Sequence, residues 1–464
     1  MIIQPKETNR TFPMKKIIAL IFLLFITQIS FAQHRIELKI KGLRDSTLYL
    51  VHHYEDTFLS QDTAIVNASG VAVFEGKKKL PEGFYVVAMG RSRIFDVIIN
   101  DQTFSMETDT ADYTNNLKIT GSVEAKLFQD FISQANAKAQ KLKGANDAQK
   151  RLIYSDLEKF QKDYVKAHVG TFTSNILKAG EEIEVPPLPQ KATLQDTINQ
   201  SNYYFKHYWD NINLSDERML RTPFVGKKID TYLKNISFFE PDTIIQIADA
   251  IIEKTPRKSD LRKYVVGKFA QKFIAPEIMG REGVYIHVAE KYIIKDPESG
   301  WDTSSIRRNK DYVTKMKPIM LGNKILNMDM TDTLDVYTPL YGVKANYTLV
   351  MIYDPECHHC QETTKKLLEE YPKISAKGVK IYMACGTRDK KKWLNFVREF
   401  KTKPFINVYD SYTMTDFANN FNTTVYPNLL FLDKDKKILA NKKLDVEQYL
   451  KIIAGEEGKK VGKK

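Results

Sequence analysis

Residues 354–368 have the sequence DPECHHCQETTKKLL and hold two of the chain's three cysteines, Cys357 and Cys360. The apolar run YTLVMIY at 347–353 precedes them and predicts a buried strand. After a short turn, we expect a helix that begins at Cys357 and runs to Tyr371. The first turn of a helix has unpaired N–H groups and a partial positive charge, so it stabilises a thiolate at Cys357.

The C-x-x-C spacing is shared by several kinds of site, which other residues help to separate. A haem anchor requires a histidine directly after the second cysteine, and this chain has Gln361 there. A structural zinc ion needs four ligands around it, and no second cysteine pair lies nearby in the sequence. A disulfide between Cys357 and Cys360 closes a very short loop and adds little stability. Redox chemistry is therefore favoured, and metal binding or a purely structural disulfide stay as alternatives.

The positions of the two cysteines predict different roles. Cys357, at the start of the helix, is expected to be the exposed nucleophile, and Cys360, one turn later, the resolving thiol. His358 and His359 lie between them, and their N–H groups favour a neighbouring thiolate. Glu356 opposes this effect because a carboxylate disfavours a second negative charge beside it. We therefore predict a moderately oxidising pair.

The sequence around this motif alternates between strand and helix patterns. Strand patterns lie at 379–384 and 428–432, and helical patterns lie at 390–400 and 446–454. Such alternation is typical of an α/β sheet.

Four features of this part of the chain occur together in one known family. They are the segment LGNKILNMDMTD, the strand YTLVMIY, the motif CHHC, and Tyr426-Pro427 before the strand NLLFLD. With them, residues 316–453 resemble the thioredoxin fold and, within it, the TlpA-like (ResA-type) thiol–disulfide oxidoreductases of the bacterial envelope. The resemblance implies a cis peptide bond before Pro427, opposite the cysteines. It also implies that the Tyr426 backbone pairs with an extended segment of the substrate.

The chain departs from the family pattern at three positions and has one further thiol. Thioredoxins often have an aromatic residue before the first cysteine, where this chain has Glu356. Some relatives use an acid three residues beyond the second cysteine for proton transfer, where this chain has Thr363. The adjacent Glu362 is our candidate for that role. The family's buried acid beneath the site corresponds here to the apolar Met351. Cys385 ends the strand KIYMAC and is expected near the pair, either as a buried strand-end residue or as a third thiol.

The remaining patterns predict a multidomain chain with an N-terminal all-β sandwich-like domain, a helical middle domain and a C-terminal α/β thioredoxin fold. Three prolines in the run VPPLPQ indicate a semi-rigid linker between two helical parts. The expected segments are a signal peptide (1–32), the β-sandwich-like domain (33–122), a helical segment (123–180), the Pro-rich linker (181–194), the helical domain (195–315), the thioredoxin-like domain (316–454) and a basic disordered tail (455–464).

Residues 1–32 have the features of a secretory signal peptide. A basic start is followed by an apolar run at 17–26 and by small residues at Ser30 and Ala32, where a signal peptidase cleaves. The apolar run is shorter than a membrane-spanning helix. We therefore expect a periplasmic protein, with membrane anchoring through an uncleaved signal as the alternative.

Charge and motif together lead to three functional hypotheses. The formal net charge is +13, but the basic residues are scattered among acids and do not form the aromatic-lined basic stripe of a nucleic-acid site, so no nucleic-acid partner is expected. The first hypothesis is an exported thiol–disulfide oxidoreductase that exchanges disulfides with envelope proteins, is recycled by a membrane redox partner and needs no bound cofactor. The second is an envelope binding module for a glycan, peptide or protein, with an accessory redox site. The third is metal binding or delivery through CHHC.

Overall fold

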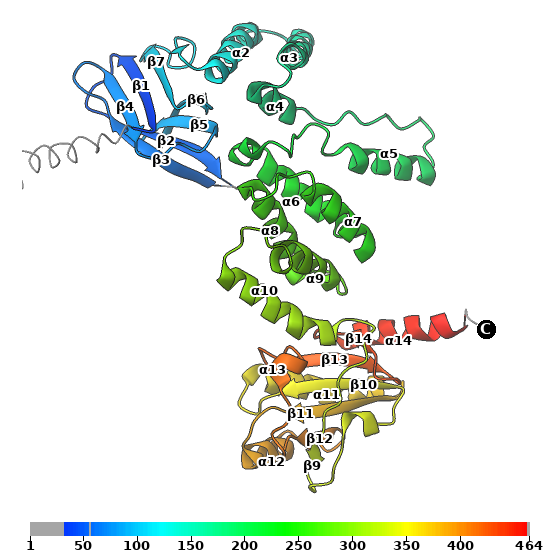
Figure 1. Cartoon of the computed structure of the whole chain (residues 1–464). Coiled ribbons are helices and arrows are strands. Elements are labelled where there is room, and N and C mark those ends of the chain that lie inside the picture. The colour runs from blue at the N-terminus through cyan, green and yellow to red at the C-terminus, as the bar shows by residue number, and fades with distance from the viewer. Residues whose placement is uncertain (1–31, 55–56, 462–464) are drawn as a thin grey trace, which may run out of the picture. The chain divides into compact units, whose positions relative to one another are not determined.

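The computed structural model describes residues 32–54 and 57–461. The predicted signal peptide lies outside these residues, apart from its last one. The chain divides into two compact units after Lys227, and each unit is described by itself. The predicted fold class is confirmed, because a β-sheet domain, a helical region and an α/β thioredoxin-like domain follow one another along the chain (Figure 1).

The first unit begins with a β-sandwich of two four-stranded sheets, ordered β4-β1-β7-β8 and β3-β2-β5-β6 (Figure 1). Its strands are β1 (His34–Lys41), β2 (Thr47–Tyr54), β3 (Thr57–Ile65), β4 (Val71–Gly76), β5 (Gly83–Met89), β6 (Ser92–Ile99), β7 (Thr103–Asp109) and β8 (Lys118–Thr120). Strands β1 and β7 pair in parallel, and β1 and β4 pair antiparallel. Alternate side chains point into the core, as Ile36, Leu38 and Ile40 of β1 do, because successive residues of a strand face opposite sides.

Four helices follow in the first unit: α2 (Val123–Ala139), α3 (Asp147–Ala167), α4 (Phe172–Ala179) and α5 (Leu194–His207). Helices α2, α3 and α4 share a small core of Phe131, Tyr164 and Leu177. Residues 180–193, which include the three prolines, form no helix or strand. Proline lacks the N–H group that a regular element uses, which explains this gap.

The second unit opens with helices and continues into the α/β domain. The helices are α6 (Val225–Ile236), which begins at the end of the first unit, α7 (Pro241–Ile252), α8 (Asp260–Ile274), α9 (Glu282–Ala289), a π-helix (Glu290–Ile294) and α10 (Thr303–Met316). The α/β domain contains β9 (Thr331–Asp332), β10 (Tyr347–Tyr353), α11 (His358–Ser375), β11 (Val379–Cys385), α12 (Lys390–Glu399), β12 (Ile406–Tyr409), α13 (Phe417–Asn420), β13 (Asn428–Asp433), β14 (Ile438–Ala440) and α14 (Val446–Val461).

The sheet of this domain has the order β14-β13-β10-β11-β12-β9. Strand β10 lies in its interior, parallel to β11 and antiparallel to β13. All seven residues of β10 are buried, which explains why its sequence is a continuous apolar run rather than an alternating one.

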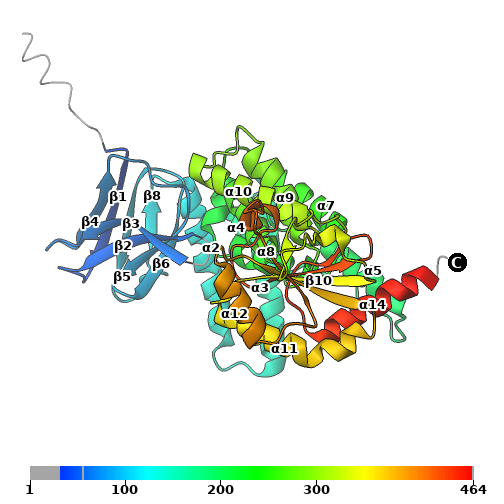
Figure 2. The same cartoon turned by 90° about the horizontal axis from the view of Figure 1, so that it is seen from below.

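Three helices, α11, α12 and α14, pack on one face of this sheet (Figure 2). They contribute Leu367, Trp393 and Tyr449 to the same core as Met351 of β10. The crossovers from β10 to β11 and from β11 to β12 run in the same direction, so their helices lie on the same face. Parallel β10 and β11 end at one edge of the sheet, where the cysteine motif follows.

Two predicted boundaries are wrong. Helix α11 begins at His358 rather than Cys357, because the backbone of Cys357 is still extended and caps the helix. The disordered tail predicted at 455–464 is wrong up to residue 461, because α14 continues to Val461. The buried Tyr449 and Ile453 fix the first half of α14, and the Glu and Lys residues that follow are good helix formers.

Among residues 32–54 and 57–461, no helix has the length and apolar character that a membrane span requires.

Candidate functional site

Cys357 is positioned by the turn that joins β10 to α11. Its N–H group donates to the carbonyl oxygen of Asp354 at 3.2 Å, which closes the turn. Its side chain then accepts the N–H of Cys360, with the nitrogen 3.3 Å from Sγ. The sulfur thus takes the place of the oxygen of an ordinary N-cap residue, at the end of the helix that favours negative charge.

The two sulfurs of the motif differ in their exposure. Cys357 is half-buried, whereas Cys360 is 0% exposed and packs in the core of the domain. Burial, and next the adjacent Cys357 thiol, raise the pKa of Cys360 above its usual value. The outer sulfur can therefore meet a substrate, and the inner one can react only with a group already bound to Cys357.

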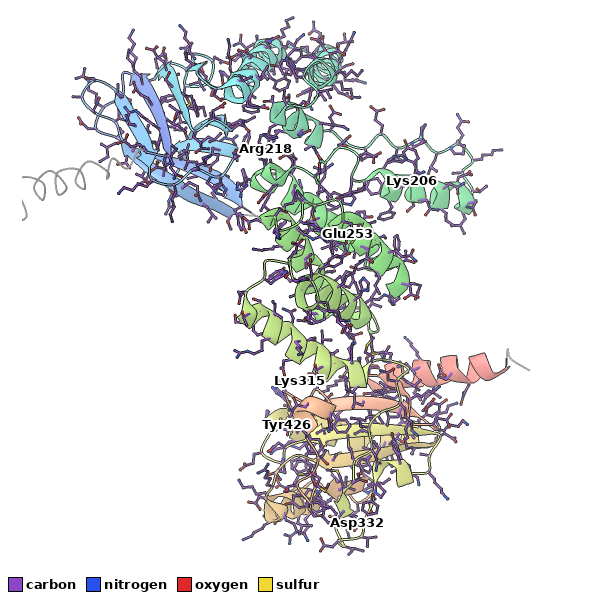
Figure 3. All side chains as sticks on the ribbon, in the orientation of Figure 1. Lys206, Arg218, Glu253, Lys315, Asp332 and Tyr426 are labelled. Atoms are coloured by element: carbon purple, nitrogen blue, oxygen red, sulfur yellow. The ribbon has the colours of Figure 1, made fainter. Side chains whose placement is uncertain are left out.

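The loop before β13 lies against the outer sulfur. The Tyr426–Pro427 peptide bond is cis. The Cys357 thiol donates to the carbonyl oxygen of Tyr426, with the sulfur and oxygen 3.5 Å apart. Tyr426, which is labelled in Figure 3, is half-buried. This brings the backbone at Tyr426 next to the sulfur that a substrate would meet.

The side chain of Tyr426 occupies a space left by a glycine. A Cβ atom at Gly386 would overlap the Tyr426 hydroxyl group and lie 3.0 Å from Cζ of the ring. Gly386 directly follows Cys385 and donates its N–H to the carbonyl of Tyr353 at 2.8 Å. The end of β11 therefore supports the loop that faces Cys357.

The predicted tuning and proton-transfer residues lie on the outer surface of α11. The side chains of His358 and His359 are 77% and 79% exposed. Their ring nitrogens lie 3.1 and 3.5 Å from the carboxylate of Glu362. Glu362 is thus engaged by the two histidines. Glu356 is paired with Lys392 at 2.8 Å, which reduces its opposition to a thiolate at the helix start.

Where some relatives carry an acid, three residues beyond the second cysteine, this chain has the hydroxyl group of Thr363. Thr363 is buried and donates to the carbonyl of His359 at 2.6 Å. Its hydroxyl oxygen also accepts a hydrogen bond from Lys443 at 2.9 Å. A lysine therefore contacts the place where relatives carry an acid.

The third thiol, Cys385, ends β11 directly opposite Tyr353 in the sheet register. It is 0% exposed. Burial raises its pKa to about 12. A protonated, buried thiol is a poor nucleophile, so in this arrangement Cys385 acts as a core residue.

Two residues of the site were missed in the sequence analysis. In the sequence, Asp354 indicates only a turn, although it lies three residues before the first cysteine. Gly386 carried no signal, because its role depends on Tyr426, which lies far away in the sequence. Among residues 32–54 and 57–461, no group of three or more His, Cys, Asp or Glu side chains is arranged to hold a metal ion.

Comparisons with protein families match three parts of the chain. Residues 345–438 match a thioredoxin-like family. Residues 34–128 and 155–316 match two domains of unknown function, DUF4369 and DUF5106. No protein with a curated description matches the chain.

Several solved structures are similar to this chain. A domain of a possible thiol-disulfide isomerase from Cytophaga hutchinsonii is 37% identical over 32% of this chain and 99% of its own, with a TM-score of 0.29. A thioredoxin-like protein from Bacteroides caccae is 23% identical over 59% of this chain and 99% of its own, with a TM-score of 0.48. A thiol:disulfide interchange protein from a Bacteroides species is 20% identical over 29% and 89% of the two chains, with a TM-score of 0.27.

Proposed function

Because the chain belongs to the TlpA-like thioredoxin-fold oxidoreductases with additional N-terminal domains, we propose that it exchanges disulfides with envelope proteins through Cys357 and Cys360. In this proposal Cys357 is the nucleophile and Cys360 the resolving thiol. The Tyr426 backbone, held by the cis bond to Pro427, pairs with the substrate segment. His358 and His359 favour the Cys357 thiolate from the solvent side.

One observation carries the proposal. A half-buried sulfur caps a helix, with a fully buried sulfur behind it and the carbonyl of Tyr426 in front of it. The helix start supports a thiolate, and the backbone at Tyr426 gives an extended peptide a partner beside that thiolate. A structural disulfide would need neither feature.

The reaction follows from the exposure of the two sulfurs. The Cys357 thiolate attacks a substrate disulfide, and one substrate sulfur leaves as a thiolate. Cys360 then attacks the Cys357 sulfur, and the second substrate sulfur leaves. The substrate gains two electrons and Cys357–Cys360 becomes a disulfide, which a membrane redox partner reduces again. The opposite direction would oxidise a substrate dithiol.

The cellular setting is part of the same proposal. The pattern of residues 1–32 supports export to the periplasm. Disulfide-containing proteins are common in that compartment and rare in the cytosol, so substrates would be available there.

The proposal is tested by reduction of insulin by the full chain, with dithiothreitol as the electron source. We expect Cys357→Ser to lower the rate to the uncatalysed background, because no other described thiol is accessible. Cys360→Ser, first reduced and then freed of dithiothreitol, should accumulate a mixed disulfide with insulin chains, since the resolving thiol is missing. The measurement is turbidity together with mass spectrometry of trapped species.

Cys385→Ala is the matched control, because it removes a thiol that is buried and outside the helix start. It should retain the wild-type rate. Full activity of Cys357→Ser, or a wild-type rate equal to background, would overturn the proposal.

A second candidate function, the binding module, has one observation in its favour. A cavity of about 960 Å³ lies in the first unit among α2, α3, α5 and the proline-containing segment. Its lining combines apolar Phe131, Leu157 and Tyr203 with acidic Glu181 and Glu182. Such a lining suits a ligand with both apolar and cationic groups.

A further inference from the structure

The buried sulfur of Cys360 has to lose a proton before it can attack the mixed disulfide. Its side chain is 0% exposed, and burial raises its pKa. Bulk water therefore cannot readily accept the proton. The candidate from the sequence, Glu362, is engaged by His358 and His359 on the outer face of α11. The position of the family's acid is Thr363, which has no carboxylate.

Asp354 lies in the turn directly before the two cysteines, and a backbone hydrogen bond holds its carboxylate. Its Oδ1 accepts the N–H of Glu356 at 2.8 Å, and its carbonyl accepts the N–H of Cys357 at 3.2 Å. The backbone N–H of Asp354 acts to lower the pKa of Cys360, against the larger effect of burial. In the described part of the chain, no donor lies within hydrogen-bond distance of Oδ2 of Asp354, so this oxygen is available to take a proton.

The field of Asp354 reaches three groups on three different elements. Burial is the main cause of the raised pKa values of Cys360, Cys385 and Tyr426, and the negative charge of Asp354 adds to each of them. These groups belong to α11, β11 and the loop before β13. The negative charge of Asp354, a half-buried residue, therefore acts on groups from three elements that meet at the site.

We propose that the carboxylate of Asp354 accepts the proton of Cys360 when the mixed disulfide is resolved. This inference rests on the proposed function of Cys357 and Cys360. As the Cys360 S–H bond breaks, its proton passes to Asp354 and its electron pair forms the bond to the Cys357 sulfur. The bond from Cys357 to the substrate sulfur breaks, and the substrate leaves as a thiolate. Asp354 then returns its proton to the solvent or to that thiolate.

The other titratable groups around Cys360 are less suited to this task. They are the thiols Cys357 and Cys385, the phenols Tyr353 and Tyr426, and Lys392 at the start of α12. Cys357 is part of the mixed disulfide at this step. Burial raises the pKa of Cys385, Tyr353 and Tyr426, so these groups keep their own protons. The hydrogen bond with Glu356 raises the pKa of Lys392, which therefore stays a cation.

The test uses Ellman's reagent, a small aromatic disulfide that releases a coloured thiolate, on the reduced full chain. The first equivalent reports the attack by Cys357, and the second reports resolution by Cys360. In Asp354→Asn, which keeps the turn and the backbone amide, we expect an unchanged first phase. The second phase should slow about a hundredfold, the usual contribution of a general base. In the variant it should also rise steeply with pH, because only free Cys360 thiolate then attacks.

Glu369→Gln is the matched control, because Glu369 is an exposed acid on α11, and both phases should stay at wild-type rates. An unchanged second phase in Asp354→Asn overturns the assignment. So does equal slowing of both phases, which would indicate damage to the site. If the second phase is slowed in Glu362→Gln and unchanged in Asp354→Asn, then Glu362 rather than Asp354 accepts the proton of Cys360. If the wild type releases no second equivalent, the proposed function and this inference fall together.

Discussion

At the scale of single residues, reactivity is set by where each sulfur lies relative to the start of α11. Cys357 caps the helix and is half-buried, while Cys360 is one turn inside and fully buried. The same side-chain chemistry therefore gives an accessible thiol at one position and a protected thiol at the other. The turn Asp354–Cys357 holds the carboxylate that we propose as the proton acceptor for this pair.

The contact between Gly386 and Tyr426 depends on the absence of a side chain at residue 386. In Gly386→Ala, the new Cβ would overlap the Tyr426 hydroxyl and push the loop away from Cys357. A displaced backbone loses its pairing with the substrate, and misplacements of about 1 Å can cost up to a hundredfold in rate. We expect the insulin-reduction rate of Gly386→Ala to fall about tenfold or more.

Gly455→Ala serves as the control for this change, because a Cβ at Gly455 meets nothing within 4 Å. It should keep the wild-type rate. A wild-type rate in Gly386→Ala would show that the position of the Tyr426 side chain is unimportant for exchange.

At the scale of elements, Asp249 on α7 joins the helices of the second unit. Its Oδ1 lies 2.8 Å from Nε2 of His287 on α9 and accepts the hydroxyl of Tyr292 at 2.8 Å. Its Oδ2 lies 3.0 Å from Nζ of Lys291. Lys291 and Tyr292 are consecutive residues of the π-helix. A π turn is wider than an α turn, so it changes which side chains face a neighbouring helix.

This network makes the stability of the helical region depend on pH. Burial acts to raise the pKa of Asp249, but hydrogen bonds from His287, Tyr292 and Lys291 outweigh it and lower the pKa. The stabilisation is therefore present above the pKa of an unfolded Asp and is lost as the pH falls through the folded pKa. At pH 7, we expect Asp249→Asn to lower the free energy of unfolding by about 1–3 kcal/mol.

Urea denaturation at pH 7 and at about pH 3 measures this effect, and the difference between variant and wild type should shrink at the lower pH. Gln246→Ala, an exposed change on the same helix, should stay within about 0.5 kcal/mol of wild type. Equal stability of Asp249→Asn and wild type at pH 7 would contradict the role of the network.

At the scale of the whole molecule, the β-sandwich and the thioredoxin-like domain have separate hydrophobic cores. One core is built from residues of β1–β7 together with Ala125 of α2, and the other from β10, β11, β13 and the helices α11, α12 and α14. Cys360 belongs to the second core, and Cys357 packs against it. Exchange should therefore not require an intact first core.

Phe74→Ala tests this independence, because Phe74 of β4 is 0% exposed in the first core. We expect it to lower the stability of the sandwich by about 3–5 kcal/mol and to leave the insulin-reduction rate unchanged. Phe431→Ala, in the second core, is the matched comparison and should lower the rate. A loss of exchange in Phe74→Ala at a temperature where the thioredoxin-like domain stays folded would favour a role of the first unit in the reaction.

The sequence by itself determined the order of the elements around the cysteines and the fold class. These features depend on local patterns, such as the apolar run of β10, the proline-containing segment and the strand–helix alternation. Neighbouring residues decide such patterns through backbone preference and burial. The start of α11 was misplaced by one residue and the extent of α14 was underestimated, because helix ends depend on capping and packing as well as on periodicity.

Only the tertiary structure decided which residues meet at the site. Gly386 and Tyr426 lie 40 positions apart, and Asp249 and His287 lie 38 apart, so no local pattern links either pair. Whether the Glu362 side chain points to solvent or to the cysteines depends on which face of α11 packs against the sheet. Only the residues of the hydrophobic core show which face that is. Such contacts form when whole helices and strands pack against one another. They can therefore be identified only once the complete fold is known.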